Sequence, residues 1–133
     1  MKRLFSSLVA LLLVFTIGLA GCSSNTPSGL TGNYSEDTVA VIESLRTALD
    51  LPSNSDEQKE AQAVARQTIN DFAGLYRREP SLQARASFTT MMTALNALAG
   101  HYGTYANRPV PPKLKDRLEQ EFKQVEMALR RDS

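Results

Sequence analysis

Residues 112–133 read PKLKDRLEQEFKQVEMALRRDS, and their apolar side chains recur every three or four positions. These side chains are Leu114, Leu118, Phe122, Val125 and Leu129. A repeat close to 3.6 residues places them on one face of an α-helix, with charged residues on the opposite face. The segment therefore predicts an amphipathic helix that begins at about Pro112 and buries Phe122 against neighbouring helices.

Two further helical segments lie earlier in the chain. The first is expected to begin near Ser35, an N-cap residue followed by two acidic residues that suit the positive end of a helix dipole. It should end before Pro52, because proline disfavours helix in the residue that precedes it. The second is expected to begin after Ser55, with Gln58 three residues on as a capping box, and to end at Pro80. The expected buried faces are Val39, Val41, Ile42, Leu45, Ala48 and Leu49 in the first helix, and Ala61, Val64, Ala65, Thr68, Ile69, Phe72, Ala73 and Tyr76 in the second.

A third helix is expected from Ser81 or Leu82 to about Tyr105, where three prolines within residues 109–112 prevent its continuation. No segment after residue 21 alternates polar and apolar side chains with a period of two, so no β-strand is expected. Four helices joined by short loops favour antiparallel neighbours. The sequence therefore predicts an all-α protein, an up-down-up-down four-helix bundle over residues 34–133.

The beginning of the chain has the features of an export signal. Basic residues at positions 2 and 3 are followed by an apolar stretch over residues 8–20 and by the sequence LAGC at residues 19–22. This order is typical of a secretory signal peptide, and the stretch is shorter than the ~20 apolar residues of a membrane span. The LAGC sequence resembles the lipobox of bacterial lipoproteins, in which the cysteine receives a diacylglyceryl group and the new amino terminus can be acylated. We expect a cleaved signal peptide over residues 1–21 and a lipidated Cys22; the alternative is an ordinary signal peptide followed by an unmodified cysteine.

The segment after the cysteine is small and polar and is interrupted by glycine and proline, so residues 22–33 are expected to form a lipidated flexible tether. Removal of residues 1–21 lowers the basic side chains from 15 to 13 against 14 acidic ones, and the net charge from +1 to −1. No basic excess remains for nucleic acid binding. Cys22 is the only cysteine, so the single domain must be stable through its core without an internal disulfide.

The sequence contains no recognisable catalytic or metal-binding pattern. His101 is the only histidine, and neither Glu-x-x-His nor Cys-x-x-Cys-His occurs, which argues against a metal site or haem in a helical bundle. There is no Gly-x-Ser-x-Gly nucleophile elbow. We therefore expect no catalytic residue, no metal ligand and no cofactor other than the lipid, and we interpret His101 as a polar surface or interface residue.

Five residues are candidates for binding a partner. Tyr102, Tyr105 and Arg108 precede a proline-stiffened turn, and tyrosine and arginine dominate the hot spots of protein interfaces. The alternative for these three residues is a packed helix corner. Arg77 and Arg78 follow the second helix, where the alternative is a solvated helix end whose charges suit the dipole.

Several segments together resemble one protein family. They are GLTGNYSEDT at residues 29–38, INDF at 69–72, YRR at 76–78, FTTM at 88–91, TALNALAGHY at 93–102 and NRPVPPKLK at 107–115. With the lipobox, these segments strongly resemble the cyanobacterial photosystem II assembly and repair lipoproteins numbered twenty-seven, a family of luminal four-helix-bundle factors. The resemblance covers essentially all of the chain after the signal peptide.

The resemblance implies a non-catalytic protein that is lipid-anchored on the luminal side of the cellular thylakoid membrane. It implies binding to manganese-free intermediates of photosystem II through PsbC, the core-antenna chlorophyll protein, and a delay in the binding of extrinsic subunits. We expect the protein to be a monomer. The alternative is a membrane-anchored lipoprotein that carries a metal or a small ligand, against which stands the missing cluster of ligands.

Overall fold

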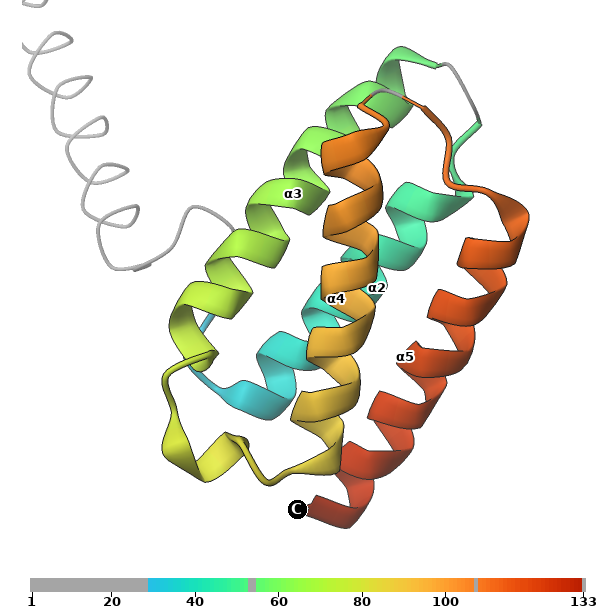
Figure 1. Ribbon diagram of the computed structural model, residues 1–133. Coiled ribbons are helices and arrows are strands. Elements are labelled where there is room, and N and C mark those ends of the chain that lie inside the picture. Colours follow the sequence, from blue (N-terminus) through green and yellow to red (C-terminus); the bar gives the residue numbers. More distant parts are fainter. Residues whose placement is uncertain (1–28, 53–54, 107, 133) are drawn as a thin grey trace, which may run out of the picture.

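The computed structural model describes residues 29–52, 55–106 and 108–132. In these residues the regular structure is helical: α2 (Tyr34–Asp50), α3 (Asp56–Tyr76), the short 3-10 helix η1 (Pro80–Leu82), α4 (Ala86–Thr104) and α5 (Pro112–Asp132). Figure 1 shows the four α-helices packed side by side and running alternately up and down. This arrangement confirms the predicted all-α four-helix bundle. The predicted signal peptide, Cys22 and residues 22–28 of the tether lie outside the described residues.

The four helices surround one apolar core. The pairs α4–α5 and α2–α3 make the most extensive contacts, and α3–α4 and α2–α5 complete the ring. Phe122 is fully buried, as predicted from the repeat in α5. The largest buried apolar side chains around it are Phe72, Ile42, Leu45, Met91, Leu95, Leu98 and Leu118. No described helix is both long enough and apolar enough to cross a membrane.

The predicted N-cap of the first helix is wrong by two residues. Asn33, not Ser35, is the N-cap of α2, and its side chain accepts a hydrogen bond from the backbone N–H of Glu36 at 3.1 Å. Both residue types are good caps, so the local sequence alone does not separate them. The cap of α3 is the predicted one, since Ser55 Oγ accepts the N–H of Gln58 at 3.0 Å.

The third helix begins later than predicted. Residues 80–82 form η1, the chain turns, and α4 begins only at Ala86, after the extended residue Arg85. Leu82 is 4% exposed. The break between η1 and α4 shows that the predicted continuous helix from residue 81 or 82 is wrong, and Leu82 packs into the core from the connection.

Two valines that were expected in the core are exposed. Val39 of α2 is 38% exposed and Val64 of α3 is 58% exposed. Val39 precedes the buried Leu45 by six residues. This spacing is not a whole number of 3.6-residue turns, so the side chain of Val39 faces away from the core. Val64 lies at the edge of its helix face, where it borders a surface groove.

Candidate functional site

The five predicted partner-binding residues lie at two different ends of the bundle. Arg77 and Arg78 follow α3, whereas Tyr102, Tyr105 and Arg108 lie at or beyond the last turn of α4. Because α3 and α4 are antiparallel, these groups are separated by about the length of the 19-residue α4, roughly 28 Å. Arg77 and Arg78 therefore do not form one surface with Tyr102, Tyr105 and Arg108.

The two ends of the bundle are called the terminal end and the distal end. The terminal end holds the start of α2, residues 77–85 and the last residues of α5 (Figure 1). The distal end holds the end of α2, the start of α3, the end of α4 and the start of α5 (Figure 1).

Tyr102 does not belong to an exposed surface. Its side chain is 2% exposed, and burial raises the pKa of its hydroxyl to about 12. The alternative of a packed helix corner therefore holds for this residue. Its neighbour His101 is half-buried and packs against the ring of Tyr105 at 5.4 Å between ring centres.

Tyr105 and Arg108 remain as an exposed pair at the distal end, here called the Tyr105–Arg108 corner. Tyr105 is 49% exposed, and the side chain of Arg108 is also exposed. The backbone of Arg108 is held at both polar groups: its N–H donates to the carbonyl of Tyr105 at 3.1 Å, and its carbonyl accepts from Gln62 Nε2 at 3.0 Å. A fixed backbone with exposed aromatic and guanidinium side chains suits a protein-binding surface, because little order has to be gained on binding.

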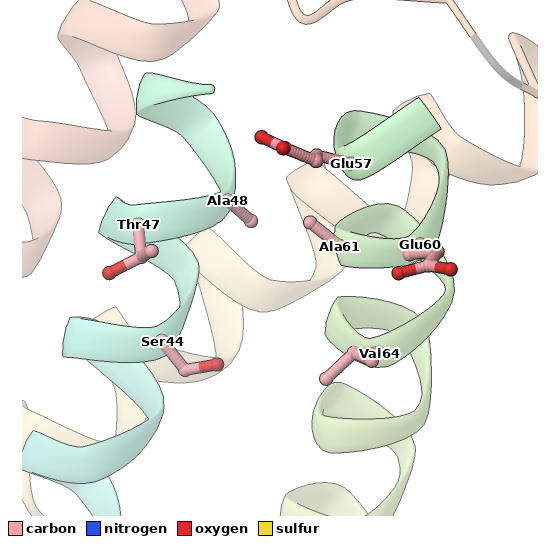
Figure 2. Close-up of a pocket in the computed structure, with 7 residues that line it drawn as sticks. All are labelled: Ser44, Thr47, Ala48, Glu57, Glu60, Ala61 and Val64. Atoms are coloured by element: carbon pink, nitrogen blue, oxygen red, sulfur yellow. The ribbon is translucent and has the colours of Figure 1, made fainter. Parts of the chain in front are cut away.

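A groove at the same end was missed by the sequence analysis. It lies between α2 and α3, has a volume of about 410 Å³, and is lined by Ser44, Thr47, Ala48, Glu57, Glu60, Ala61 and Val64. Figure 2 shows Ala48 and Ala61 facing each other across the gap, with Glu57 reaching from the first turn of α3 toward α2. Small side chains on the two facing helices leave the hollow, and these small residues were the available signal in the sequence.

The groove combines an apolar floor with carboxylates at its rim, and this combination favours a basic side chain. Lysine and arginine pack their aliphatic stems on apolar surface while their charged ends reach a polar partner. A metal site has no such support: in the part of the chain that the structure describes, no three His, Cys, Asp or Glu side chains come together as ligands.

The terminal end is organised around a buried carboxylate. Asp37 is 1% exposed and accepts hydrogen bonds from the Tyr76 hydroxyl at 2.5 Å and from the Gly32 N–H at 2.9 Å. Its other oxygen accepts from the N–H and hydroxyl of Thr31 at 2.7 and 2.8 Å. Burial disfavours the charged form, but these hydrogen bonds outweigh it and lower the pKa of Asp37 below its ordinary value of 3.8.

This carboxylate binds the chain that precedes α2 to the bundle. Thr31 and Gly32 are hydrogen-bonded to Asp37, and Leu30 is only 8% exposed within the core cluster. The prediction that the flexible tether extends to Asn33 is therefore wrong at its last four residues, because Leu30 to Asn33 are part of the folded domain.

A second hydrogen-bonded chain joins three helices at the terminal end. The Tyr34 hydroxyl lies 2.8 Å from Ser87 Oγ, and Ser87 Oγ donates to Asp132 Oδ2 at 2.6 Å. These contacts connect the start of α2, the start of α4 and the last residue of α5. The place where the chain enters the bundle is thereby fixed against the other helices.

The fold defines a class, the antiparallel four-helix bundle, here with an exposed corner and a groove as candidate binding surfaces. The chain belongs to the family described as Photosystem II Pbs27, whose model matches residues 4–129. The family resemblance read from the sequence is thus confirmed. The relatives are named as assembly and repair proteins, and this supports the expectation that the chain is not an enzyme.

Similar proteins are found in cyanobacteria and in a plant. "Photosystem II assembly factor lipoprotein Psb27" of Thermosynechococcus vestitus is 57% identical, with 100% of this chain and 98% of the relative covered. "Photosystem II lipoprotein Psb27" of Synechocystis sp. is 51% identical, with 98% and 96% covered. "Photosystem II repair protein PSB27-H1, chloroplastic" of Arabidopsis thaliana is 36% identical, with 74% and 57% covered.

Solved structures of this family have the same fold. The solution structure of Psb27 from cyanobacterial photosystem II superposes with a TM-score of 0.76 at 50% identity, covering 82% of this chain and 95% of that chain. The crystal structure of PSB27 from Arabidopsis thaliana superposes with a TM-score of 0.71 at 36% identity, covering 75% and 98%.

Proposed function

We propose that this protein is a non-catalytic assembly and repair factor of photosystem II in the thylakoid. The observation that carries the proposal is the 57% identity, over the whole chain, to a relative named as a photosystem II assembly factor. Two exposed surfaces at the distal end, the Tyr105–Arg108 corner and the groove between α2 and α3, give such a factor places to bind.

The finer proposal concerns the partner and the timing. The protein binds the luminal face of manganese-free intermediates through PsbC and delays the binding of extrinsic subunits while it is bound. The support for this step is the family membership together with the exposed tyrosine and arginine of the corner, which are residue types that dominate hot spots. It acts as a monomer in this proposal.

The proposal includes a lipid anchor at Cys22. The LAGC sequence at residues 19–22 and the word lipoprotein in the names of two relatives support it. A single fatty chain binds a membrane only marginally, so stable attachment needs two or more chains. Attachment would place the folded domain on the luminal side of the membrane, where the proposed partner is exposed.

The anchor is tested by Cys22→Ser. The wild-type protein should partition into detergent with its mass raised by lipid, whereas the variant should stay uncleaved or be released from the membrane. A mature wild-type protein without added mass that washes off with salt would contradict the anchor. Metal analysis of the same preparation tests the alternative of a carrier, which stoichiometric bound metal would favour.

The docking surface is tested by Arg108→Ala. If Arg108 is a hot spot, capture of manganese-free photosystem II should weaken by ~2 kcal/mol, roughly thirtyfold. Helicity should be unchanged, because the backbone at Arg108 is held by Gln62 and not by the guanidinium. Arg66→Ala is the matched control, an exposed arginine on α3, and it should leave capture unchanged. Equal capture by Arg108→Ala and the wild type would remove Arg108 from the docking surface.

A further inference from the structure

The terminal end of the bundle carries a group of exposed arginines. They come from three segments that meet there: the residues after α3, the residue before α4 and the last turn of α5 (Figure 1). The group consists of Arg77, Arg78, Arg85, Arg130 and Arg131, all of them exposed. They are named here the terminal arginines.

Most of these arginines form no ion pair within the described residues. Within the described residues, Arg77, Arg78 and Arg131 form no ion pair. The contrast is with Arg46 in the middle of the bundle, which binds Glu119 at 2.8 Å and also Glu126. Exposed cations without internal partners remain available to an external anion.

The carboxylates at this end do not offset the whole group. Of the acidic residues Glu36, Asp37, Glu79 and Asp132 at this end, only Glu79 lies within residues 77–85, which also carry three of the arginines. Arg85 is further held in place, because its guanidinium carbon lies 5.8 Å from the ring centre of Tyr34. The outer face of the connection between α3 and α4 therefore has a cationic surplus.

The chain also enters the bundle at this end. Asp37 holds Thr31 and Gly32 on the first turn of α2, so the position of the described N-terminus is fixed relative to the terminal arginines. A chain spans at most ~3.6 Å per residue. The seven steps from Cys22 to Gly29 therefore cannot exceed about 25 Å in any conformation.

We propose that the terminal end faces the membrane and that its arginines bind anionic lipid headgroups. The inference rests on the proposed anchor at Cys22, which keeps this end within a short reach of the lipid. A guanidinium presents planar paired donors that match the oxygens of a phosphate-type headgroup. The bundle then stands on its terminal end, and the Tyr105–Arg108 corner and the groove between α2 and α3 point away from the membrane.

The proposal predicts an orientation that depends on charge and can be measured on the lipidated protein in vesicles. Cys22 is the only cysteine, so once it carries lipid, an introduced cysteine is a unique labelling site. A fluorophore on Ser81→Cys reports the terminal end, and one on Thr104→Cys reports the distal end; both positions are exposed. In phosphatidylglycerol vesicles with a headgroup quencher, the label at position 81 should be quenched more strongly than the label at position 104.

The arginines are then tested by Arg77→Gln/Arg78→Gln. We compare the number of molecules whose terminal end faces the membrane with the number whose distal end does. Each basic side chain near an anionic surface changes this ratio about fivefold, so the loss of two should lower it roughly 25-fold. Lys59→Gln/Arg66→Gln removes the same charge from exposed positions on α3 that lie farther from the terminal end. This control should leave the ratio nearly unchanged. In phosphatidylcholine vesicles the ratio of the wild type should fall to the value that the Cys22 anchor alone produces.

Four results would overturn the proposal. Quenching at position 81 that is equal in the two kinds of vesicle, or unchanged by Arg77→Gln/Arg78→Gln, would show that the arginines do not bind lipid. An equal effect of the Lys59→Gln/Arg66→Gln control would show a dependence on net charge alone. Weaker capture of detergent-solubilised photosystem II by Arg77→Gln/Arg78→Gln, with its orientation on vesicles unchanged, would assign these arginines to a protein partner.

The failure of the anchor is recognised separately. A wild-type protein whose mass shows no lipid would contradict both the anchor and the membrane proposal, and this is known before any vesicle is prepared. A lipidated protein that lacks a charge-dependent orientation would contradict only the role of the arginines.

Discussion

The two ends of the bundle are held by different kinds of contact. At the terminal end, Asp37 joins Tyr76 of α3 to the chain before α2, and Ser87 joins α4 to the end of α5. At the distal end, the described part of the connection after α4 is held by two hydrogen bonds, from Gln62 Nε2 to the Arg108 carbonyl and from the Arg108 N–H to the Tyr105 carbonyl. The burial of Tyr102 and Val110 adds apolar contacts.

The difference has a physical consequence for binding. Buried polar groups that are fully hydrogen-bonded fix one geometry, because any displacement leaves a donor or an acceptor unpaired in a medium of low dielectric constant. Apolar contacts at the distal end stabilise without that directional demand. The terminal end is therefore suited to setting the position of the chain, and the distal end to presenting side chains.

The largest effect on stability is expected in the central core, which both ends of the bundle share. Phe122→Ala should lower the free energy of unfolding by ~3–5 kcal/mol through lost burial and the cavity that remains. Urea unfolding followed by helicity measures it, and Met127→Ala, 48% exposed on the same helix, should cost less than about 0.5 kcal/mol. An unchanged melting temperature for Phe122→Ala would mean that the two ends do not share one core.

Asp37→Asn tests the terminal end alone. Hydrogen bonds to a charged group contribute ~1.5–3 kcal/mol each, so losing the charge should lower the free energy of unfolding by about 2–3 kcal/mol. Hydrogen exchange should accelerate at the amides of Thr31 and Gly32, but not at the amide of Arg108. Glu36→Gln, an exposed acid in the same turn, is the control. Equal acceleration at both ends would contradict their independence.

The same carboxylate should make the terminal end sensitive to acid. The pKa of Asp37 is lowered from 3.8 in the folded protein, so its stabilisation is present above pH 3.8 and is lost as the pH falls through the folded value. The free energy of unfolding of the wild type should therefore fall more steeply than that of Asp37→Asn, by at most ~1.4 kcal/mol per pH unit. Urea midpoints between about pH 5 and pH 2 measure this, and parallel curves would contradict it.

The smallest effect on the free energy of unfolding is expected for a substitution at the distal end, and it depends on alkaline pH. The pKa of Tyr102 is raised from 10.0 to about 12 by burial, so its contribution is complete below pH 10 and is lost as the pH rises toward 12. Tyr102→Phe should remove that loss and cost less than about 1 kcal/mol at neutral pH. Tyr76→Phe is the comparison from the other end. Its hydroxyl donates to Asp37, so it should cost ~1.5–3 kcal/mol at neutral pH. Equal costs for the two tyrosines would show that the ends are held alike.

The helices and the centre of the core were predictable because their signals are local. The repeat that includes Leu118, Phe122 and Val125 places them on one buried face, and Ser55 caps α3 as expected. The prediction was wrong where the local sequence did not distinguish between two positions or two environments. Ser35 and Asn33 both suit an N-cap, and Val64 has the polarity of a core residue but lies beside a groove.

The candidate site was predicted less well, for a related reason. Tyrosine and arginine were chosen by residue type, which does not reveal whether a ring faces the core or the solvent. Tyr102 and Tyr105 are three residues apart on or next to one helix, yet they are 2% and 49% exposed. The separation of Arg77 from Arg108 follows from the antiparallel packing of α3 and α4, which residue type also does not indicate.

The sequence by itself determined the all-α class, the four helices and the residues at the centre of the core, because helical periodicity and capping act over a few neighbouring residues. Only the tertiary structure decided which distant groups meet. Asp37 and Tyr76 are 39 residues apart, Gln62 and Arg108 are 46 apart, and Ser87 and Asp132 are 45 apart. Each pair forms only after the helices have packed, since packing brings the two groups together and removes the water that would otherwise bind them.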